Sequence, residues 1–569
     1  MYNRFFRKIR KSVTRKYKDI DPEDIFLDST NLPGFAENRF EGRIEKPISN
    51  ITFFLVKGVL FIILILFVGR LWNLQINNGA SFNKISENNR LSHTLIFANR
   101  GVIYDRNKVE LATNAIKQNN SEFADRVYPS IDGLSHVVGY VKYPSKDSSG
   151  FYYEENYRGQ SGVEKTYNDT LAGVNGLKIT ETDARGNVTS ESVIQKPQNG
   201  QDLTLSIDAK LNEELYKAMK DIKETRGFTG GAGAIMDVNT GEILAITSFP
   251  GFDQNVVTKG EDSKEIASLF ASSDKPFLDR AVSGLYTPGS IVKPIMGLAA
   301  LQEGVITENK QILSTGSISV PNPYDKTKPT IYKDWRVNGL TNIREALAVS
   351  SDVYFYEVGG GFADQKGLGI NAIDRYFEMF GMTEKTGIDI PGENSGIVAS
   401  PAWKSENFNG EPWRLGDTYI TSIGQYGTQV TVLEALRWVG AIANKGTLLV
   451  PTVVLGGKSP SARVFRTIDL PDSVWTAVQE GMKQGVDTGI VGILKTPAVA
   501  IAAKTGTAEL GATKSHVNSW STGFFPFDHP HYAFAVLMEN GPANNSVGAT
   551  YVMQEVVNWM IQNTPEYIK

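Results

Sequence analysis

The sequence has no cysteine among its 569 residues, and this absence removes several kinds of chemistry at once. Disulfide bonds, thiolate metal sites and a cysteine nucleophile are all excluded. Histidine is also scarce, and its five occurrences lack the spacing of metal ligands; they are His93, His136, His516, His529 and His531. We therefore predict no metal site, and we also expect no cofactor.

An excess of positive charge is missing as well. The 58 Lys and Arg residues are outnumbered by 62 Asp and Glu residues, which gives a net charge of -4. A nucleic-acid partner would require a basic surface to neutralise phosphates, so none is predicted. Internal repeats and low-complexity segments are absent too. The 41% hydrophobic content is typical of a folded protein, and the length suits two or three domains.

One long hydrophobic run stands out, at residues 51–69, with the sequence ITFFLVKGVLFIILILFVG. Its single charge, Lys57, lies near the start and could reach the lipid headgroups. Arg70 and Trp72 follow where interfacial anchors belong. The run comes too late in the chain for a cleaved signal peptide. It predicts a transmembrane helix over residues 51–72.

The orientation follows from a cluster of basic residues before that helix. The cluster consists of Arg4, Arg7, Lys8, Arg10, Lys11, Arg15, Lys16 and Lys18. Positive charge flanking a membrane span stays on the cytoplasmic side. We therefore expect residues 1–50 to form a basic cytoplasmic tail of a single-pass protein in the cytoplasmic membrane, with all later residues outside.

The external part changes character near residue 226. Residues 73–225 are polar and broken into short β-like pieces, which predicts an irregular, β-rich pedestal domain. A β-hairpin pattern follows at 233–248, then helical patterns at 291–303, 342–358 and 432–444. Strand patterns return at 498–503, 519–525 and 533–539, before an amphipathic helix at 549–562. This order predicts an α+β domain over 226–569, an antiparallel sheet flanked by helices.

The pattern Ser290-x-x-Lys293 precedes an apolar run that ends at Leu301. Pro294 is tolerated only in the first turn of a helix, so a buried helix must begin close to Ser290. Ser290 then lies at the positive end of the helix dipole, with Lys293 on the same face. Apolar neighbours would lower the pKa of this lysine and make it a base for the serine. The same spacing at Ser81–Lys84 and Ser272–Lys275 falls in polar surroundings and predicts only solvated surface.

Two further motifs carry hydroxyls and charge. Lys504-Thr505-Gly506, followed by Thr507, closes an apolar strand pattern and offers a site for a carboxylate along an edge strand. A second copy at Lys385–Gly387 has no strand before it and is interpreted as a structural turn. Ser350-Ser351-Asp352 falls inside an otherwise apolar helical stretch. Ser350 either bonds back to the helix backbone or relays protons between two lysines.

Ser290-x-x-Lys293, Ser350-x-Asp352 and Lys504-Thr505-Gly506, in that order, resemble the motif set of penicillin-binding proteins and serine β-lactamases. Further fragments are similar to class B penicillin-binding proteins, which join a pedestal to a transpeptidase domain. They include Arg100-Gly101 and Gly162-Val163-Glu164 in the pedestal, and Gly241-Glu242-Ile243 and Ile423-Gly424-Gln425 in the transpeptidase domain. Aspartate at position 352 makes the chain most like penicillin-binding protein 2, the elongation member.

The resemblance implies a peptidoglycan D,D-transpeptidase that β-lactams inhibit and whose donor is an acyl-D-Ala-D-Ala stem peptide. In such an enzyme Ser290 would form the acyl-enzyme and Lys293 would take its proton. The N–H groups of Ser290 and Thr507 would form the oxyanion hole. Ser350 would pass a proton to the leaving D-alanine, with Lys504 close by.

The remaining site residues also take their roles from the resemblance. Thr505, Gly506 and Thr507 would hold the substrate's terminal carboxylate, and Asp352 would pair with a lysine. No segment resembles a glycosyltransferase, so a separate membrane glycan polymerase of the shape, elongation, division and sporulation family is expected as a partner. Some members bind zinc near the middle motif through Cys and His, which this chain lacks there.

Departures and alternatives remain. Asp253-Gln254-Asn255 and Thr431-Val432-Leu433-Glu434 differ from the family's usual Asp-Pro-Asn and Thr-Pro-Leu-Gln. A septal transpeptidase is one alternative. A membrane-anchored serine β-lactamase or carboxypeptidase shares the motifs but would leave the pedestal unexplained. A penicillin-sensing receptor and a catalytically dead scaffold are others, although the tail carries no effector domain and no motif is lost.

Overall fold

The computed structural model describes residues 50–82, 91–115, 122–182, 188–322, 325, 327–456 and 463–569. The chain divides into two units, Met1–Leu91 and Ser92–Lys569. Nearly all of the predicted basic tail, and Lys84, lie outside the described residues. In the first unit, helix α1 (Asn50–Trp72) continues into one π-helical turn, η3 (Asn73–Asn77).

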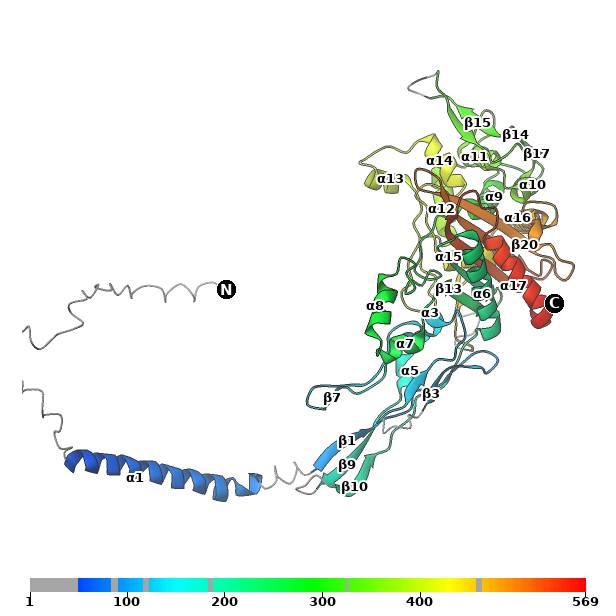
Figure 1. The fold of residues 1–569 in the computed structure, drawn as a ribbon. Coiled ribbons are helices and arrows are strands. Elements are labelled where there is room, and N and C mark those ends of the chain that lie inside the picture. Colours follow the sequence, from blue (N-terminus) through cyan, green and yellow to red (C-terminus); the bar gives the residue numbers. More distant parts are fainter. Residues whose placement is uncertain are drawn as a thin grey trace, which may run out of the picture. The chain divides into compact units, whose positions relative to one another are not determined.

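Helix α1 matches the predicted membrane span closely (Figure 1). Together with η3 it forms a stretch, Ile51–Asn77, that is long and apolar enough to cross a membrane, and none of it is buried inside the chain. Of the helices in the described residues, it is the one with this length and composition. A helix that is apolar on every face and covered by nothing fits a lipid environment rather than a protein core.

The second unit is organised around a five-stranded sheet with the strand order β13-β12-β22-β21-β20. All neighbouring strands are antiparallel. The strands are β12 (Gly230–Asp237), β13 (Ile243–Phe249), β20 (Ala502–Leu510), β21 (His516–Phe525) and β22 (Tyr532–Pro542). The predicted α+β class is confirmed, and so is the hairpin that opens the sheet.

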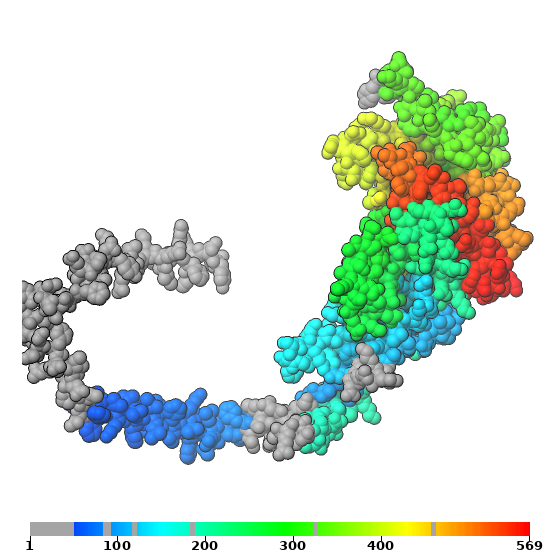
Figure 2. Space-filling model, in the orientation of Figure 1, coloured from blue at the N-terminus to red at the C-terminus, as the bar shows by residue number. Residues whose placement is uncertain are grey.

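Both faces of the sheet are buried because its central strands are apolar almost without interruption, and successive residues point to opposite faces. In β22, Ala533, Ala535 and Leu537 pack into one core, which includes helices α9 (Lys293–Gln302) and α15 (Val432–Ala443). Their neighbours Phe534, Val536 and Met538 pack into the other core, beneath α6 (Ala209–Arg226) and α17 (Ala549–Asn563). Helix α17 lies beside α6 on the surface (Figure 2). The sheet is therefore the middle layer of three.

Other elements complete the part of the chain that follows residue 226. The helices are α7 (Gln254–Lys259), α8 (Ser263–Ala271), α10 (Ile343–Val349), α11 (Asp352–Gly360), α12 (Ile370–Met379), α13 (Pro401–Asn407), α14 (Leu415–Ser422) and α16 (Asp472–Asp487). Small two-stranded sheets pair β14 (Ile312–Ser314) with β17 (Gly339–Thr341), β15 (Ser317–Val320) with β16 (Thr330–Lys333), and β18 (Thr447–Leu449) with β19 (Val464–Thr467).

The segment before α6 is built from short strands, as predicted. One sheet has the order β1-β9-β10 and another the order β11-β2-β3-β4. Their strands are β1 (Leu91–Ile96), β2 (Ile103–Tyr104), β3 (Glu110–Ala115), β4 (Asp125–Val127), β9 (Gly176–Thr182), β10 (Val188–Gln195) and β11 (Leu203–Thr204). Two short helices, α4 (Gly162–Thr166) and α5 (Asn168–Ala172), follow one another on either side of Tyr167. The domain boundaries at 72, 225 and 226 remain predictions.

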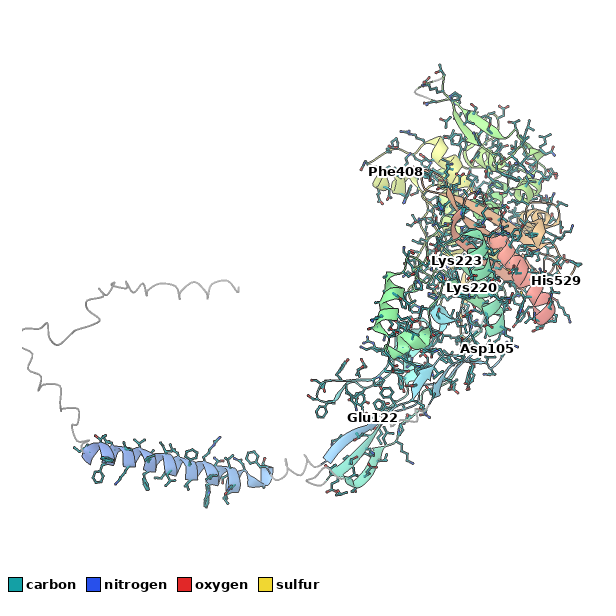
Figure 3. The ribbon with its side chains drawn as sticks, in the orientation of Figure 1. Asp105, Glu122, Lys220, Lys223, Phe408 and His529 are labelled. Carbon is teal, nitrogen blue, oxygen red and sulfur yellow. The ribbon has the colours of Figure 1, made fainter. Side chains whose placement is uncertain are left out.

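A buried charge cluster holds this segment together. The Glu164 carboxylate accepts hydrogen bonds from Arg100 Nε at 2.5 Å and Arg126 Nε at 2.8 Å, and all three side chains are fully buried. Removing one partner of such a cluster would leave a buried charge uncompensated, at a cost of roughly 3–5 kcal/mol. In the same segment lies Asp105, which is labelled in Figure 3. Its carboxylate accepts the backbone N–H of Val109 and of Ala209, the first residue of α6.

Candidate active site

Ser290 lies in a tight turn that leads into helix α9. Residues Gly289–Val292 form a 3-10 turn, and α9 starts at Lys293 with Pro294 as its second residue. The helix therefore begins where the proline requires it to begin. Ser290 is half-buried and lines the largest cleft described below, whereas Lys293 is completely buried.

Ser350 interrupts what the sequence predicts as one continuous helix over 342–358. The helix breaks into α10 and α11, and Ser350 between them adopts a left-handed backbone with φ of 55°. Ser351 caps α11 by accepting the N–H of Tyr354. Because of this break, the Ser350 hydroxyl does not bond back to the helix backbone. It instead accepts hydrogen bonds from Lys293 and Lys504.

Strand β20 carries the Lys504-Thr505-Gly506 motif at the edge of the sheet. The expectation that the strand ends at the motif is wrong, because β20 starts at Ala502 and continues to Leu510. Its pairing with β21 runs without a register shift from Ala502 to Leu510, which sustains the strand past the motif. Lys504 is fully buried, Thr505 is half-buried and Thr507 is exposed.

The motifs meet in a network of short polar contacts. Lys293 Nζ donates to Ser350 Oγ at 3.2 Å, to the Ser350 carbonyl at 2.9 Å and to Asp352 Oδ1 at 2.6 Å. Lys504 Nζ donates to the same Ser350 Oγ at 2.8 Å and to the Thr505 carbonyl at 2.8 Å. Side chains from α9, the α10–α11 break and β20 thus converge on one hydroxyl.

Burial of two neighbouring lysines has an electrostatic consequence. Burial lowers the pKa of Lys504 well below its ordinary value, and the nearby charge of Lys293 lowers it further. The Asp352 carboxylate acts in the opposite direction. Two ammonium groups beside one hydroxyl repel each other strongly at low local dielectric, so the site favours a state in which Lys504 is neutral.

Glycines let the backbone of the Ser290 turn pack closely against its neighbours. A Cβ on Gly424, whose φ is +73°, would lie only 2.2 Å from the Gly289 carbonyl oxygen. A Cβ on Gly506 would lie 2.7 Å from the Pro288 carbonyl oxygen. Only glycine permits these approaches, which bring the edge strand against the serine turn.

The residues around this network border a cleft of about 1230 Å³. Ser290, Ser350, Asp352, Thr505, Gly506 and Thr507 all line it. A volume of this size exceeds that of ordinary small-molecule pockets and suits an extended ligand. The cleft is open along β20, where an edge strand has unpaired backbone groups to offer to a peptide.

The other copies of the short motifs lie elsewhere. Lys275 is exposed and Ser272 ends helix α8, so this pair is not enclosed. At Lys385–Gly387 the backbone N–H groups of Thr386 and Gly387 bond to Glu393, which makes this copy a capped turn. The side chain of Lys385 is exposed. None of these residues lines the cleft.

Sequence reasoning missed Asp334, which supports the α10–α11 break from a distant segment. Its Oδ2 accepts hydrogen bonds from Ser351 Oγ at 2.7 Å, from Ser314 Oγ at 2.9 Å and from the Val353 N–H at 3.1 Å. These bonds outweigh burial and keep the pKa of Asp334 below its ordinary value. No local pattern marks this aspartate, because its partners are distant in sequence.

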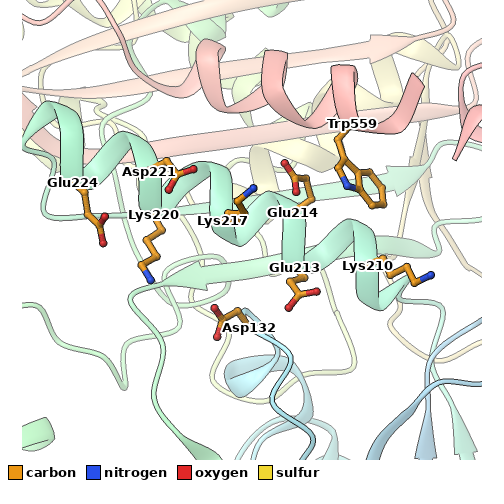
Figure 4. Close-up of a pocket in the computed structure, with 9 residues that line it drawn as sticks. All are labelled: Asp132, Lys210, Glu213, Glu214, Lys217, Lys220, Asp221, Glu224 and Trp559. Atoms are coloured by element: carbon orange, nitrogen blue, oxygen red, sulfur yellow. The ribbon is translucent and has the colours of Figure 1, made fainter. Parts of the chain in front are cut away.

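A second hollow, of about 600 Å³, runs along helix α6 (Figure 4). It is lined by charged side chains of both signs together with Trp559. Interleaved charges along one helix are typical of a solvated surface. Within the described segments no group of three or more His, Asp or Glu side chains is arranged to hold a metal ion.

Comparison with known proteins places this architecture in a family. The description "Penicillin binding protein transpeptidase domain" matches residues 231–558, and "Penicillin-binding Protein dimerisation domain" matches residues 119–205. The chain is 29% identical to the peptidoglycan D,D-transpeptidase MrdA of Acinetobacter baumannii, over 87% of this chain and 86% of that protein.

Two solved structures are similar over most of the chain. Penicillin-binding protein 2 of Pseudomonas aeruginosa, in complex with WCK 5153, is 30% identical with a TM-score of 0.67, covering 83% of this chain and 98% of that one. A chain from a structure on the coordination of polymerization and crosslinking by a peptidoglycan synthase complex is 26% identical, with a TM-score of 0.68 and coverage of 89% and 97%. The chain therefore belongs to the penicillin-binding protein transpeptidase family, as a class B member most like penicillin-binding protein 2.

Proposed function

We propose that this protein is a peptidoglycan D,D-transpeptidase of cell elongation that cross-links stem peptides through an acyl-enzyme on Ser290. The observation that carries the proposal is the convergence of Lys293 and Lys504 on the Ser350 hydroxyl, in a cleft that Ser290 also lines. A nucleophile next to linked proton carriers is the arrangement that acyl transfer requires. The similarity to MrdA supports the elongation role over septation.

The donor peptide would lie along the edge strand β20. Its terminal carboxylate would be held by the hydroxyls of Thr505 and Thr507, and Gly506 keeps the strand close to the Ser290 turn. Ser290 would attack the carbonyl of the penultimate D-alanine. The backbone N–H groups of Ser290 and Thr507 would stabilise the oxyanion, which is worth about 10²–10³-fold in rate for one such donor.

The position of one proton decides when Ser290 becomes reactive. In the free site Lys293 Nζ would pair with Asp352 Oδ1 at 2.6 Å, while burial lowers the pKa of Lys504 and so favours its neutral form. An arriving carboxylate favours the charged form of Lys504. A proton would then pass from Lys293 to Ser350 Oγ while the hydroxyl proton moves on to Lys504. Lys293 becomes the free base that accepts the Ser290 proton, and Ser350 later relays a proton to the leaving D-alanine.

A transpeptidase differs from a β-lactamase in how long the acyl-enzyme survives. A class A lactamase clears it with a dedicated glutamate and a bound water. Glu393, a candidate for that role by its place in the sequence, caps the Thr386 turn and does not line the cleft. The penicilloyl adduct should therefore persist for many minutes. A pulse of fluorescent penicillin followed by an unlabelled chase measures this, and loss of the label within seconds would move the protein to the lactamase class.

We also propose the topology and a partner. The basic cluster before α1 favours a cytoplasmic N-terminus and an external catalytic domain. A membrane glycan polymerase of the shape, elongation, division and sporulation family would supply the strands, because the described chain has no second catalytic motif. We expect α1 and the pedestal to make this contact. Co-purification with the polymerase should be lost when residues 51–225 are replaced by unrelated sequence and kept when the catalytic serine is replaced.

A further inference from the structure

Beyond the three motifs, the turn that carries Ser290 is bonded to the sheet by a buried indole. Trp520 of strand β21 is fully buried, and its Nε1 donates a hydrogen bond of 3.0 Å to the Thr287 carbonyl. Within the sheet, Trp520 is the register partner of Gly506 in β20. The same side chain borders the cleft. One residue therefore contacts both the serine turn and the strand that carries the Lys-Thr-Gly motif.

The backbone of this turn has little stiffness of its own. Gly289 adopts a left-handed φ of 57°, and glycine is the residue with the greatest backbone freedom. Pro288, just before it, has no N–H with which to bond the turn to its surroundings. The position of Ser290 therefore depends on bonds from other segments. One comes from Gly424, whose carbonyl accepts the Gly289 N–H at 2.8 Å, and another comes from Trp520.

The bond from Trp520 has a particular importance because it comes from the sheet. The proposed oxyanion hole takes one N–H from Ser290 in the turn and the other from Thr507 on β20. These donors belong to different elements, so their separation depends on how the turn is held against the sheet. A Cβ placed on Gly506 would lie 3.2 Å from Trp520 Cβ, which shows how closely strand and indole approach. Misplacing a reacting group by about 1 Å can cost roughly 10²-fold in rate.

Resting on the proposed function, we infer that Trp520 is a positioning residue for acylation, whose indole N–H fixes the Ser290 turn relative to β20 and so holds the two oxyanion donors at their working separation. Trp520 acts through the Thr287 carbonyl, to which its hydrogen bond is donated. The oxyanion forms only as the acyl-enzyme is made, so a displaced donor weakens the transition state and not the first encounter with the ligand. Loss of the N–H should therefore slow the chemical step and leave binding nearly intact.

Two variants of the full-length protein test this. Trp520→Phe removes the N–H with part of the ring, whereas 3-benzothienylalanine at position 520 replaces the N–H with sulfur and keeps the bicyclic ring. Timed labelling at several concentrations of fluorescent penicillin separates the acylation rate constant from the dissociation constant of the preceding complex. The rate constant should fall about tenfold in both variants, as expected for one lost hydrogen bond and a small misplacement, while the dissociation constant changes by less than about twofold.

A second probe reports on the oxyanion donors themselves. Phenylacetamidomethylboronic acid forms a tetrahedral adduct with a reactive serine and so resembles the transition state. Its affinity is measured by the slowing of penicillin labelling. In both variants it should bind about tenfold more weakly, in parallel with the fall in the acylation rate constant.

Trp475→Phe is the matched control for a buried tryptophan. Trp475 belongs to α16, packs against Phe380 and does not line the cleft. Its replacement should lower the melting temperature but leave the acylation rate constant and the affinity for the boronic acid unchanged.

The outcomes separate this inference from the proposed function. An unchanged acylation rate constant in both Trp520 variants, a loss confined to the dissociation constant, or unaltered binding of the boronic acid would overturn the positioning role. The same holds if Trp475→Phe slows acylation as much as Trp520→Phe does. Failure of penicillin to label the wild-type protein would instead refute the proposed function.

Discussion

Lys504 reaches from the edge strand β20 to Ser350, with its Nζ 2.8 Å from Ser350 Oγ. Lys293, the first residue of helix α9, donates to the same oxygen. The hydroxyl thus links two buried lysine amines that are distant in sequence. A proton that moves between the lysines has a direct path through it. The proton relay proposed for acylation passes through this hydroxyl, and its contribution to the acylation rate is measurable.

Replacing Ser350 with alanine should slow acylation by penicillin about 10²–10⁴-fold, the usual contribution of a positioned proton carrier. Stopped-flow or timed labelling measures the rate. Ser351→Ala is the matched control, because Ser351 caps α11 and bonds to Asp334 without contacting either lysine. That variant should lose roughly 1 kcal/mol of stability, and because the Val353 N–H still bonds to Asp334, it should slow acylation far less than Ser350→Ala does. Equal acylation rates of the wild type and Ser350→Ala would contradict a proton relay through Ser350.

The duplicated Lys-Thr-Gly tripeptide allows a second comparison. Lys504→Ala removes a buried group from the network and should lower the acylation rate by at least about 10²-fold. Lys385→Ala removes an exposed side chain at a turn held by Glu393 and should leave both rate and stability nearly unchanged. Similar losses in both variants, measured at matched thermal stability, would mean that the choice between the two copies is wrong.

The close packing around Gly424 leads to a third prediction, about substitution by alanine. Alanine there would meet the Gly289 carbonyl at 2.2 Å and would also be strained at a φ of +73°. Gly304 has a similar φ of +65° but open space around its Cβ position. Gly304→Ala should therefore cost only the backbone strain, roughly 1 kcal/mol. Gly424→Ala should cost more and slow penicillin labelling, since the Ser290 turn must shift. Identical melting temperatures and labelling rates in the two variants would contradict this account.

His136 gives a pH dependence of stability. Burial lowers its pKa below the ordinary value of 6.5, and its Nε2 lies 2.9 Å from the Pro276 carbonyl, to which it donates. Below pH 6.5 the unfolded chain binds a proton that the folded protein does not. This contribution is therefore complete above the unfolded pKa and is lost as pH falls, by up to about 1.4 kcal/mol per pH unit.

Thermal unfolding between pH 7.5 and 5 measures this effect. His136→Gln keeps an amide donor for Pro276 but cannot be protonated, so its stability should fall less with decreasing pH than that of the wild type. Parallel pH profiles for the two proteins would assign the acid sensitivity to other groups.

Much of this fold and site could be predicted from the sequence where local chemistry is decisive. Pro294 fixes the start of α9, and the apolar run at 51–69 fixes α1. Predictions from the sequence were wrong where contacts between residues distant in the chain determine the structure. The helix over 342–358 breaks at Ser350, without glycine or proline, because Asp334 holds Ser351 and Val353 from another segment. Likewise β20 runs past its glycine because β21 pairs along its whole length.

The most direct test of the central claim is the site of the covalent adduct. Purified full-length protein is treated with benzylpenicillin, digested and mapped by mass spectrometry, next to the Ser290→Ala variant. The account predicts one penicilloyl group on the peptide that contains Ser290, and none in the variant at equal thermal stability. An adduct on Ser81, Ser272 or another serine, or undiminished labelling of Ser290→Ala, would contradict it.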